Sequence, residues 1–176
     1  EFAQKGGDFE MIQLWVNLPS KFKMTEPRYQ SFDEGDFPIL DQGNHEISIK
    51  VIAGIFGTVS SKVKTFSPIN MYELNGPPNS KLEIPLPVGS NTLVFQLSGK
   101  SSIDDQQIKK GNLALLSKSG ETFEIKFLEE SKVMILNGEP IGEPVAAYGP
   151  FVMNTRQELM EAFRDFQAGK MGQLVN

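Results

Sequence analysis

Apolar and polar residues alternate with a period of two along the middle of the chain. Ile47, Ile49 and Val51 alternate with polar neighbours, and the same pattern returns within Lys81–Gly99. In a strand this period places successive side chains on opposite faces, so it predicts half-buried β-strands. The predicted strands are residues 46–54, 69–74, 82–86, 93–97, 113–117, 122–128 and 132–137.

Short turn-forming sequences separate these predicted strands. They are Asn75-Gly76-Pro77-Pro78, Ser98-Gly99, Lys110-Gly111, Ser119-Gly120 and Asn137-Gly138. Turns that recur every ~8–12 residues, with no helix between the strands, are typical of an antiparallel sandwich or barrel. The sequence therefore predicts a small β-barrel, with Lys81–Gly99 interpreted as a central hairpin.

The first part of the chain has a different pattern. Asp8–Pro19 carries Ile12, Leu14 and Val16 on one face and Trp15 on the other. A strand that is apolar on both faces is usually covered on both. We expect its partners to lie in chain that is missing here or in another molecule. The polar stretch 21–44 predicts a long connection.

One helix is predicted near the C-terminus. Thr155 and Glu158 have the spacing of a capping box, and Gly169-Lys170 supplies a stop signal. Between them lies one apolar stripe, made of Leu159, Met160, Phe163 and Phe166. For a stripe this narrow, packing on the protein's own core is favoured over binding a partner.

Composition narrows the classes of function. The chain has 176 residues and balances 17 basic against 22 acidic residues for a net charge of -5, which argues against direct nucleic-acid binding. It has no cysteine, as suits a protein of the reducing cytoplasm. No apolar run approaches the ~20 residues that span a membrane. The start at Glu1, without methionine, leads us to expect a fragment or processed product.

The inventory of reactive side chains is small. His45 is the single histidine, so the chain has no histidine pair or triad for zinc or iron. His45 stands at the entry to the predicted strand 46–54, where a partly buried histidine bonded to the backbone is favoured over a catalytic base. Asp104-Asp105 is interpreted as solvated surface rather than a metal pair. No Walker loop, Gly-x-Gly-x-x-Gly or Gly-x-Ser-x-Gly motif is present.

Four long strings resemble the pirin family, and together they extend over nearly the whole chain. They are Gln13-Leu14-Trp15-Val16-Asn17-Leu18-Pro19, Lys23-Met24-Thr25-Glu26-Pro27-Arg28-Tyr29-Gln30, Val63 to Tyr72 (VKTFSPINMY), and Glu143-Pro144-Val145 with Tyr148 to Thr155 (YGPFVMNT). The resemblance implies an all-β fold: a cupin-type antiparallel β-barrel, or jelly roll, with a C-terminal α-helix. Pirins are bicupins, with two such barrels in one polypeptide.

The resemblance also implies a division of the chain. Residues 1–30 would be the end of the first cupin barrel and the start of a linker, and residues 31–45 the rest of that linker. Residues 46–147 would form a second, metal-free cupin barrel, and residues 148–176 the C-terminal segment with its helix.

In the resembling family the iron is held in the first barrel, by three histidines and a glutamate. Glu1 lies at roughly the distance of that glutamate from Gln13, but a flanking loop residue is favoured. In the second barrel, Pro85 and Pro87 fall where paired histidines would be, and Asn91 falls near an acidic position. On this chain we therefore assign no catalytic, cofactor-binding or metal-ligating residue. Iron is expected in the N-terminal cupin of the intact protein.

The resemblance implies two functions of different classes. In the first, the chain is the structural half of a protein whose intact form resembles a non-haem iron quercetin (flavonol) dioxygenase. In the second, it belongs to an iron-dependent, redox-sensing transcription co-regulator or protein-binding module without turnover. The expected partners are the N-terminal cupin segment, or a second copy through self-association, and a flavonol-like small molecule in the intact protein. Nucleic acid and membrane are not expected.

Overall fold

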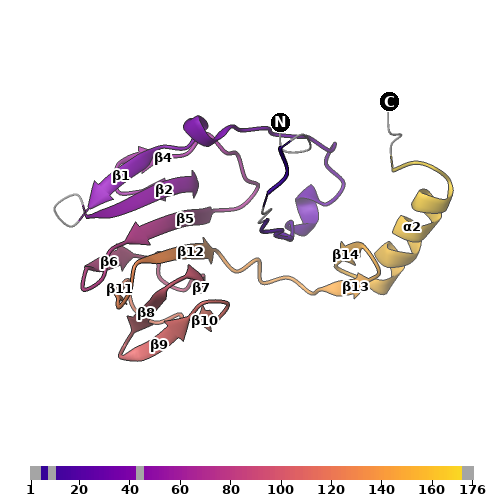
Figure 1. Ribbon diagram of the computed structural model, residues 1–176. Coiled ribbons are helices and arrows are strands. Elements are labelled where there is room, and N and C mark those ends of the chain that lie inside the picture. Colours follow the sequence, from indigo (N-terminus) through magenta and orange to yellow (C-terminus); the bar gives the residue numbers. More distant parts are fainter. Residues whose placement is uncertain (1–4, 8–10, 43–45, 172–176) are drawn as a thin grey trace. The chain divides into compact units, whose positions relative to one another are not determined.

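The computed structural model describes residues 5–7, 11–42 and 46–171 (Figure 1). Contacts divide the chain into two units: residues 24–142, which form the β-sandwich, and residues 1–23 together with 143–176. His45 and Glu1, both considered above, lie outside the described residues.

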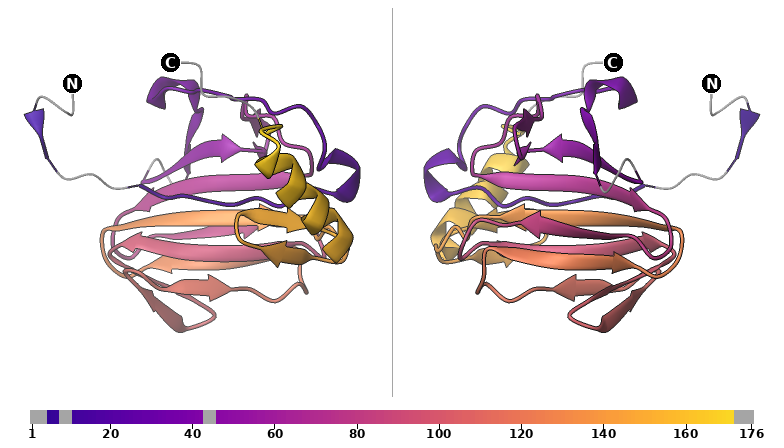
Figure 2. Two further views of the ribbon diagram at one scale, coloured as in Figure 1. Left: turned by 90° about the vertical axis from the view of Figure 1, so that its right-hand side faces the viewer. Right: turned by 90° about the vertical axis from the view of Figure 1, so that its left-hand side faces the viewer.

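The sandwich has a six-stranded sheet with the order β1-β2-β5-β12-β7-β10. In Figure 2 its long strands run alongside one another, with the orange β12 between β5 and β7. All its pairs are antiparallel. The bounds are Ile39–Gln42 for β1, Ile47–Ala53 for β2, Ile69–Gly76 for β5, Ser131–Gly138 for β12, Asn91–Ser98 for β7 and Leu113–Leu115 for β10.

The second sheet has four strands in the order β6-β11-β8-β9. They are Lys81–Pro85 for β6, Thr122–Phe127 for β11, Lys100–Ile103 for β8 and Gln106–Lys109 for β9. From β5 to β12 the chain passes repeatedly between the two sheets, as in a jelly roll. A separate two-stranded ribbon joins β3, Ile55–Phe56, to β4, Val59–Ser60.

The core lies between the facing sheets. Every second residue of β2, from Ile47 to Ala53, is buried, as the alternation predicted. The largest fully buried side chain is that of Phe127, which packs over Gly76, where an added Cβ would lie 2.6 Å from the Phe127 ring. The predicted all-β barrel fold with a C-terminal helix is thus confirmed, and its core follows the period of two.

The interpretation of Lys81–Gly99 as a hairpin is wrong. Its two strands are present, as β6 and β7, but they belong to different sheets: β6 pairs with β11, while β7 pairs with β12 and β10. Between them the chain turns at Pro87–Ser90, where the Ser90 N–H and hydroxyl both donate to the Pro87 carbonyl. Alternation reports which face of a strand is buried, and not which neighbour completes its hydrogen bonds.

Near the start of the chain, one predicted strand and one predicted connection were also wrong. Residues 11–19 form no strand, and residues 8–10 lie outside the described residues. The polar stretch 21–44 was predicted as a connection, yet it contains β1, which pairs with β2 at Leu40 and Ile49. It also contains the short 3-10 turns η1, Ser20–Phe22, and η2, Glu34–Asp36. A polar edge strand has too little alternation to be recognised.

The second unit holds the C-terminal helix. Here α2, Arg156–Gln167, follows the two-stranded ribbon of β13, Ala146–Tyr148, and β14, Phe151–Met153. The capping box of Thr155 and Glu158 is present as predicted, and Gly169 adopts a positive φ just after the helix. Phe163 packs on Tyr148 and Phe151 with ring centroids 5.5 and 4.9 Å apart.

The predicted helix stripe is only partly buried in this chain. Leu159 is buried, together with Ala162 on the same face, but Met160 and Phe166 are exposed. Core packing thus holds for Leu159, and for Phe163 through its ring contacts. Met160 and Phe166 stay largely exposed, although the Phe166 ring lies 6.1 Å from that of Phe151.

Candidate functional site

A row of polar side chains crosses the inner face of the six-stranded sheet at one end. In the strand register Asn70 of β5 lies opposite Asn137 of β12, which in turn lies opposite Thr92 of β7. Asn70 is the second residue of β5 and Asn137 the last but one of β12. The start of β5 lies beside the end of β12 (Figure 1). Inward positions elsewhere along these strands are mostly apolar, so this row forms a polar floor at the mouth of the barrel.

Asn137 is the centre of this polar row and is only 4% exposed. Its amide nitrogen donates to Ser90 Oγ at 2.6 Å and to Thr92 Oγ1 at 2.9 Å. Its carbonyl oxygen accepts from the amide nitrogen of Asn70 at 3.0 Å. A buried amide must be bonded in this way to offset its desolvation, so the bonds fix the side chain in one orientation.

Asn70 is held from its other side by the start of the short ribbon. Its Oδ1 accepts the Ile55 N–H at 3.1 Å. This contact requires glycine at position 54, where φ is +78° and an added Cβ would lie 2.1 Å from Asn70 Oδ1. The next inward residue of β5, Tyr72, donates its hydroxyl to the Ile55 carbonyl. Burial raises the pKa of Tyr72 to about 12.

A cavity of about 450 Å³ opens above this polar floor. Asn70, Asn137 and Ser90 form its base, and Glu139 stands at the rim. Its remaining walls are Pro68, Pro87, Val88, Gly89 and Pro140. The size and the mixture of apolar walls with a few convergent polar groups are those of small-molecule pockets.

The side chains at this cavity do not fit an iron ion. Iron in cupin-like sites takes imidazole and carboxylate ligands, whereas the floor presents neutral amides and hydroxyls. The Asn137 amide nitrogen is a hydrogen-bond donor, engaged with Ser90 and Thr92, and cannot ligate a cation. Across residues 5–7, 11–42 and 46–171, no three His, Cys, Asp or Glu side chains are grouped to hold a metal.

The three residues that the family resemblance aligns with the metal motif, Pro85, Pro87 and Asn91, do not all line the cavity. Pro87 lines the cavity, while Pro85 is exposed at the end of β6, opposite Thr122. The side chain of Asn91 is exposed, and its carbonyl accepts a long hydrogen bond from Asn137 at 3.3 Å. Four residues of the polar row and its surroundings were not recognised from the sequence: Asn70, Ser90, Thr92 and Asn137. Asn137-Gly138 was assigned to a turn, although its inward parity on the predicted strand 132–137 was the available signal.

Asp104 and Asp105 form the tight turn between β8 and β9. Both have positive φ, 49° and 61°, and Ile103 pairs with Gln106 across the turn. Both side chains are exposed, and Asp105 contacts Lys126 at 3.7 Å. These aspartates thus act in the turn, since Asp is among the residues that tolerate a left-handed backbone.

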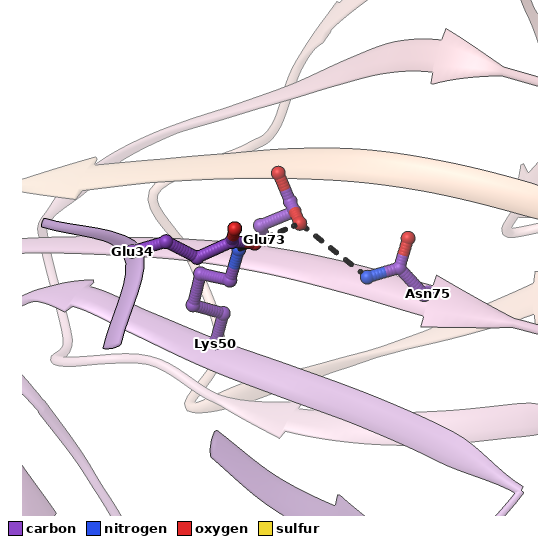
Figure 3. A network of polar contacts seen from close by, with 4 residues as sticks. All are labelled: Glu34, Lys50, Glu73 and Asn75. Atoms are coloured by element: carbon purple, nitrogen blue, oxygen red, sulfur yellow. Dashed lines mark hydrogen bonds and ion pairs between the residues drawn. The ribbon is translucent and has the colours of Figure 1, made fainter. Parts of the chain in front are cut away.

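The outer face of the six-stranded sheet is charged at one side and apolar at the other. On β2 and β5, Lys50 lies 3.3 Å from Glu34 and 3.6 Å from Glu73, and Asn75 donates to Glu73 at 3.4 Å (Figure 3). Lys50 and Glu73 are mostly buried, with side chains 18% and 17% exposed. This network occupies the part of the outer face that β2 and β5 form, and that part is therefore polar.

Beyond it, the outward residues of four strands form what we call the apolar plate. In the register Leu115, Leu93, Leu136 and Met71 make one cross-strand row, and Leu113, Phe95 and Met134 make the next. Leu115 is 72% exposed and Leu113 56%, whereas Met134 is buried. A contiguous apolar face of this kind is a feature of surfaces that bind another protein.

The second unit has its own exposed apolar segment and a polar clasp. Trp15 is 69% exposed, and Met11, Leu14 and Val16 are exposed with it. The expectation that the partners of Asp8–Pro19, and so of Trp15, lie in missing chain or in another molecule stays a prediction. The polar clasp is the set of hydrogen bonds that the Glu143 carboxylate accepts, from the Ser20 N–H at 2.7 Å and from the Asn154 amide nitrogen at 3.0 Å. The bond from the Ser20 N–H is the main cause that lowers the pKa of the Glu143 carboxyl group.

Among the described residues, no helix is long and apolar enough to cross a membrane.

Comparisons with known proteins agree on one family. Residues 71–172 match the sequence profile of the pirin C-terminal cupin domain. A Pseudomonas aeruginosa protein provisionally named a quercetin 2,3-dioxygenase is 35% identical over 96% of this chain, which spans 59% of that protein. Human pirin is 35% identical over 92% of this chain, which spans 57% of it.

A solved structure matches the fold closely. It is the crystal structure of a quercetin 2,3-dioxygenase from Acinetobacter baumannii, with a TM-score of 0.87 and 38% sequence identity. The match covers 92% of this chain and 56% of the Acinetobacter chain. The chain thus spans little more than half the length of the relatives it matches.

Proposed function

The chain belongs to the pirin family, carrying its C-terminal cupin domain, and on this premise we propose that it is the structural half of an iron-dependent flavonol dioxygenase. In this proposal the iron and the reacting flavonol bind in an N-terminal cupin. The present chain supplies no ligand to the metal. It covers and stabilises the barrel that does.

The observation that carries the structural role is the apolar plate. Leu93, Phe95 and Leu136 lie on the outward face of a sheet whose inward face already packs the protein's own core. A second barrel seated on this plate would remove its apolar surface from water, at about 25 cal/mol per Å². The enzyme class is supported by the name of the Acinetobacter relative, at 38% identity.

We also propose the domain division that the family resemblance implies. Residues 1–30 would complete the first barrel, 31–45 would link the two, 46–147 would form the metal-free cupin, and 148–176 would add the helical segment. The absence of cysteine supports a cytoplasmic location.

The experiment compares the N-terminal cupin segment alone, the same segment with this chain, and this chain alone. Each sample is loaded with Fe(II) without oxygen, desalted, and analysed for iron and for oxygen uptake with quercetin. We expect no stoichiometric iron on this chain alone. The combination should turn over quercetin at least about tenfold faster than the N-terminal segment, because covering the apolar plate orders the catalytic barrel.

The alternative, which the family resemblance also implies, is an iron-dependent protein-binding regulator without turnover. Full iron loading with no oxygen uptake beyond that of free Fe(II) would overturn the enzyme proposal and favour this alternative. Stoichiometric iron on the present chain alone would overturn the structural role, since the metal would then be held here.

A further inference from the structure

We propose that the cavity at the mouth of this cupin barrel is a second ligand site, for a small uncharged phenol. Its lining carries neutral amides and hydroxyls, which do not suit a metal. It is built wholly from the β-sandwich unit, by the start of β5, the end of β12, the residues that flank them, and the turn at Pro87–Ser90.

Hydrogen-bonding capacity is left over at the floor of the cavity. An asparagine amide has two N–H donors and a carbonyl oxygen with two acceptor positions. Asn70 uses one N–H on Asn137 Oδ1, and among the described residues no acceptor is found for the second. Asn137 Oδ1 accepts only this bond there. One donor and one acceptor therefore remain side by side.

This arrangement selects the polar group of the ligand. A hydroxyl group both donates and accepts one hydrogen bond, so it can satisfy Asn137 Oδ1 and the spare Asn70 N–H together. A carboxylate only accepts, and it would also approach Glu139 at the rim, at a cost from like-charge repulsion. The floor and rim thus favour a neutral hydroxyl over an anion.

The walls select the rest of the molecule. Three prolines, Pro68, Pro87 and Pro140, present aliphatic ring edges together with Val88. Aliphatic C–H groups pack well on the electron-rich face of a flat aromatic ring. No aromatic side chain lines the described cavity, so the aromatic partner would have to be the ligand. At about 450 Å³ the space accommodates a one-ring or two-ring compound.

The polar floor is set before any ligand arrives. The Ile55 N–H holds Asn70, and Ser90 and Thr92 hold Asn137, so neither amide must reorient on binding. A site with fixed polar groups loses little conformational entropy when it is occupied. The network alone would also serve as packing; the spare donor and acceptor, carried by two residues that line a cavity, are what point to a ligand.

The test titrates the full chain, labelled with ¹⁵N, with para-cresol, toluene, benzoate and glucose. We expect para-cresol to shift the amide signals of Val88, Gly89 and Ser90, with a Kd of about 1 mM or lower. Toluene lacks the hydroxyl, benzoate is charged and glucose is not aromatic, so each should bind at least about tenfold more weakly. Equal binding of toluene and para-cresol, glucose binding in preference to para-cresol, or no shift with para-cresol would each overturn the proposal.

A pair of matched variants locates the site. Val88→Asp replaces an apolar wall residue whose side chain is 70% exposed, so folding should survive. The affinity for para-cresol should fall at least about tenfold, because the ring would then pack on a hydrated carboxylate. Ile39→Asp makes the same kind of change on β1, 58% exposed and away from the cavity, and should leave the affinity unchanged.

The same titration on the intact, iron-free protein keeps the outcome decisive if the isolated chain aggregates. There too, Val88→Asp should abolish the shifts at residues 88–90. Unchanged para-cresol affinity in that variant would show that the phenol binds elsewhere and would overturn the proposal. Either result is independent of whether the protein turns over quercetin.

Discussion

Gly54 shows how one residue without a side chain positions a functional one. Its φ of +78° is left-handed, and an added Cβ would lie 2.4 Å from the Ile69 carbonyl oxygen as well as against Asn70. The backbone there cannot move without breaking the start of β5. Asn70 therefore keeps its place at the cavity floor only because position 54 is glycine.

We predict that Gly54→Ala lowers the free energy of unfolding by about 2–4 kcal/mol, from left-handed strain plus overpacking. The matched control is Gly57→Ala, where φ is +58° and nothing lies within 4 Å of the added Cβ. That variant should lose only the strain, about 1–2 kcal/mol. Urea unfolding of both variants measures the difference, and equal losses would contradict the close approach.

Tyr72 is the titrating residue that burial affects most visibly. Its side chain is 3% exposed, its hydroxyl donates to the Ile55 carbonyl, and burial raises its pKa to about 12 from 10.0. Because the folded pKa is the higher one, the associated stability is complete below pH 10. It is lost as the pH rises toward 12.

We predict that the wild-type chain loses roughly 2–3 kcal/mol of stability between pH 10 and 12 that Tyr72→Phe does not lose. At pH 8 the variant should already be less stable by about 1–3 kcal/mol, since the Ile55 carbonyl then lacks its partner. Urea unfolding across this pH range checks both, with Tyr29→Phe, at an exposed position, as control. Parallel pH profiles for wild type and Tyr72→Phe would refute the assignment.

At the scale of elements, the cap of α2 combines a helix signal with a charge. The Glu158 carboxylate accepts from the Thr155 hydroxyl at 3.0 Å and from the N–H groups of Thr155 and Asn154 at 2.7 and 2.9 Å. These bonds, with the Thr155 hydroxyl as the largest cause, lower the pKa of Glu158. The Thr155 hydroxyl oxygen accepts the Glu158 N–H in return, at 3.2 Å.

We predict that α2 frays in acid before the sandwich unfolds. A lowered folded pKa gives stability that is present above the ordinary carboxyl value of 4.5 and is lost as the pH falls through the folded pKa. The protection of residues 156–162 against hydrogen exchange, taken relative to the intrinsic exchange rate at each pH, should therefore fall below about pH 4.5, and Glu158→Gln should show the lower protection already at pH 7. Glu161→Gln, one turn along the same helix, is the control. Equal exchange in the two variants would argue against the cap.

For the whole molecule, the exposed apolar surfaces predict association. Leu113, Leu115 and Phe95 belong to the apolar plate, and β10, at the sheet edge, carries no charged residue to oppose pairing. Natural edge strands usually carry such charges. The isolated chain should therefore self-associate unless an N-terminal cupin segment covers it.

We predict that Leu115→Lys shifts the chain toward monomer in sedimentation velocity, while Met24→Lys, 78% exposed but outside the plate, does not. One charge at such a contact is expected to weaken association at least about tenfold, because it would have to be desolvated. A wild-type chain that stays monomeric at about 100 µM would mean that this surface needs no partner.

By itself the sequence determined which residues are buried within the barrel and how its last helix begins. Ile47, Ile49 and Val51 point into the core as their alternation predicted, and Thr155 caps α2 through Glu158 as their spacing predicted. These features depend on neighbours within a few residues, and a period or a short motif records them. The family resemblance was likewise readable, because long ordered strings carried it.

The tertiary structure decided which strands pair and which polar residues meet. Residues 81–85 and 91–98 are close in sequence yet lie in different sheets, whereas Asn70, Thr92 and Asn137 are distant in sequence and share one row. A strand's alternation is identical whichever neighbour it pairs with, so register and sheet membership come only from packing the whole barrel. The cavity at its mouth, formed by strand ends far apart in the chain, therefore has no signature in the linear pattern.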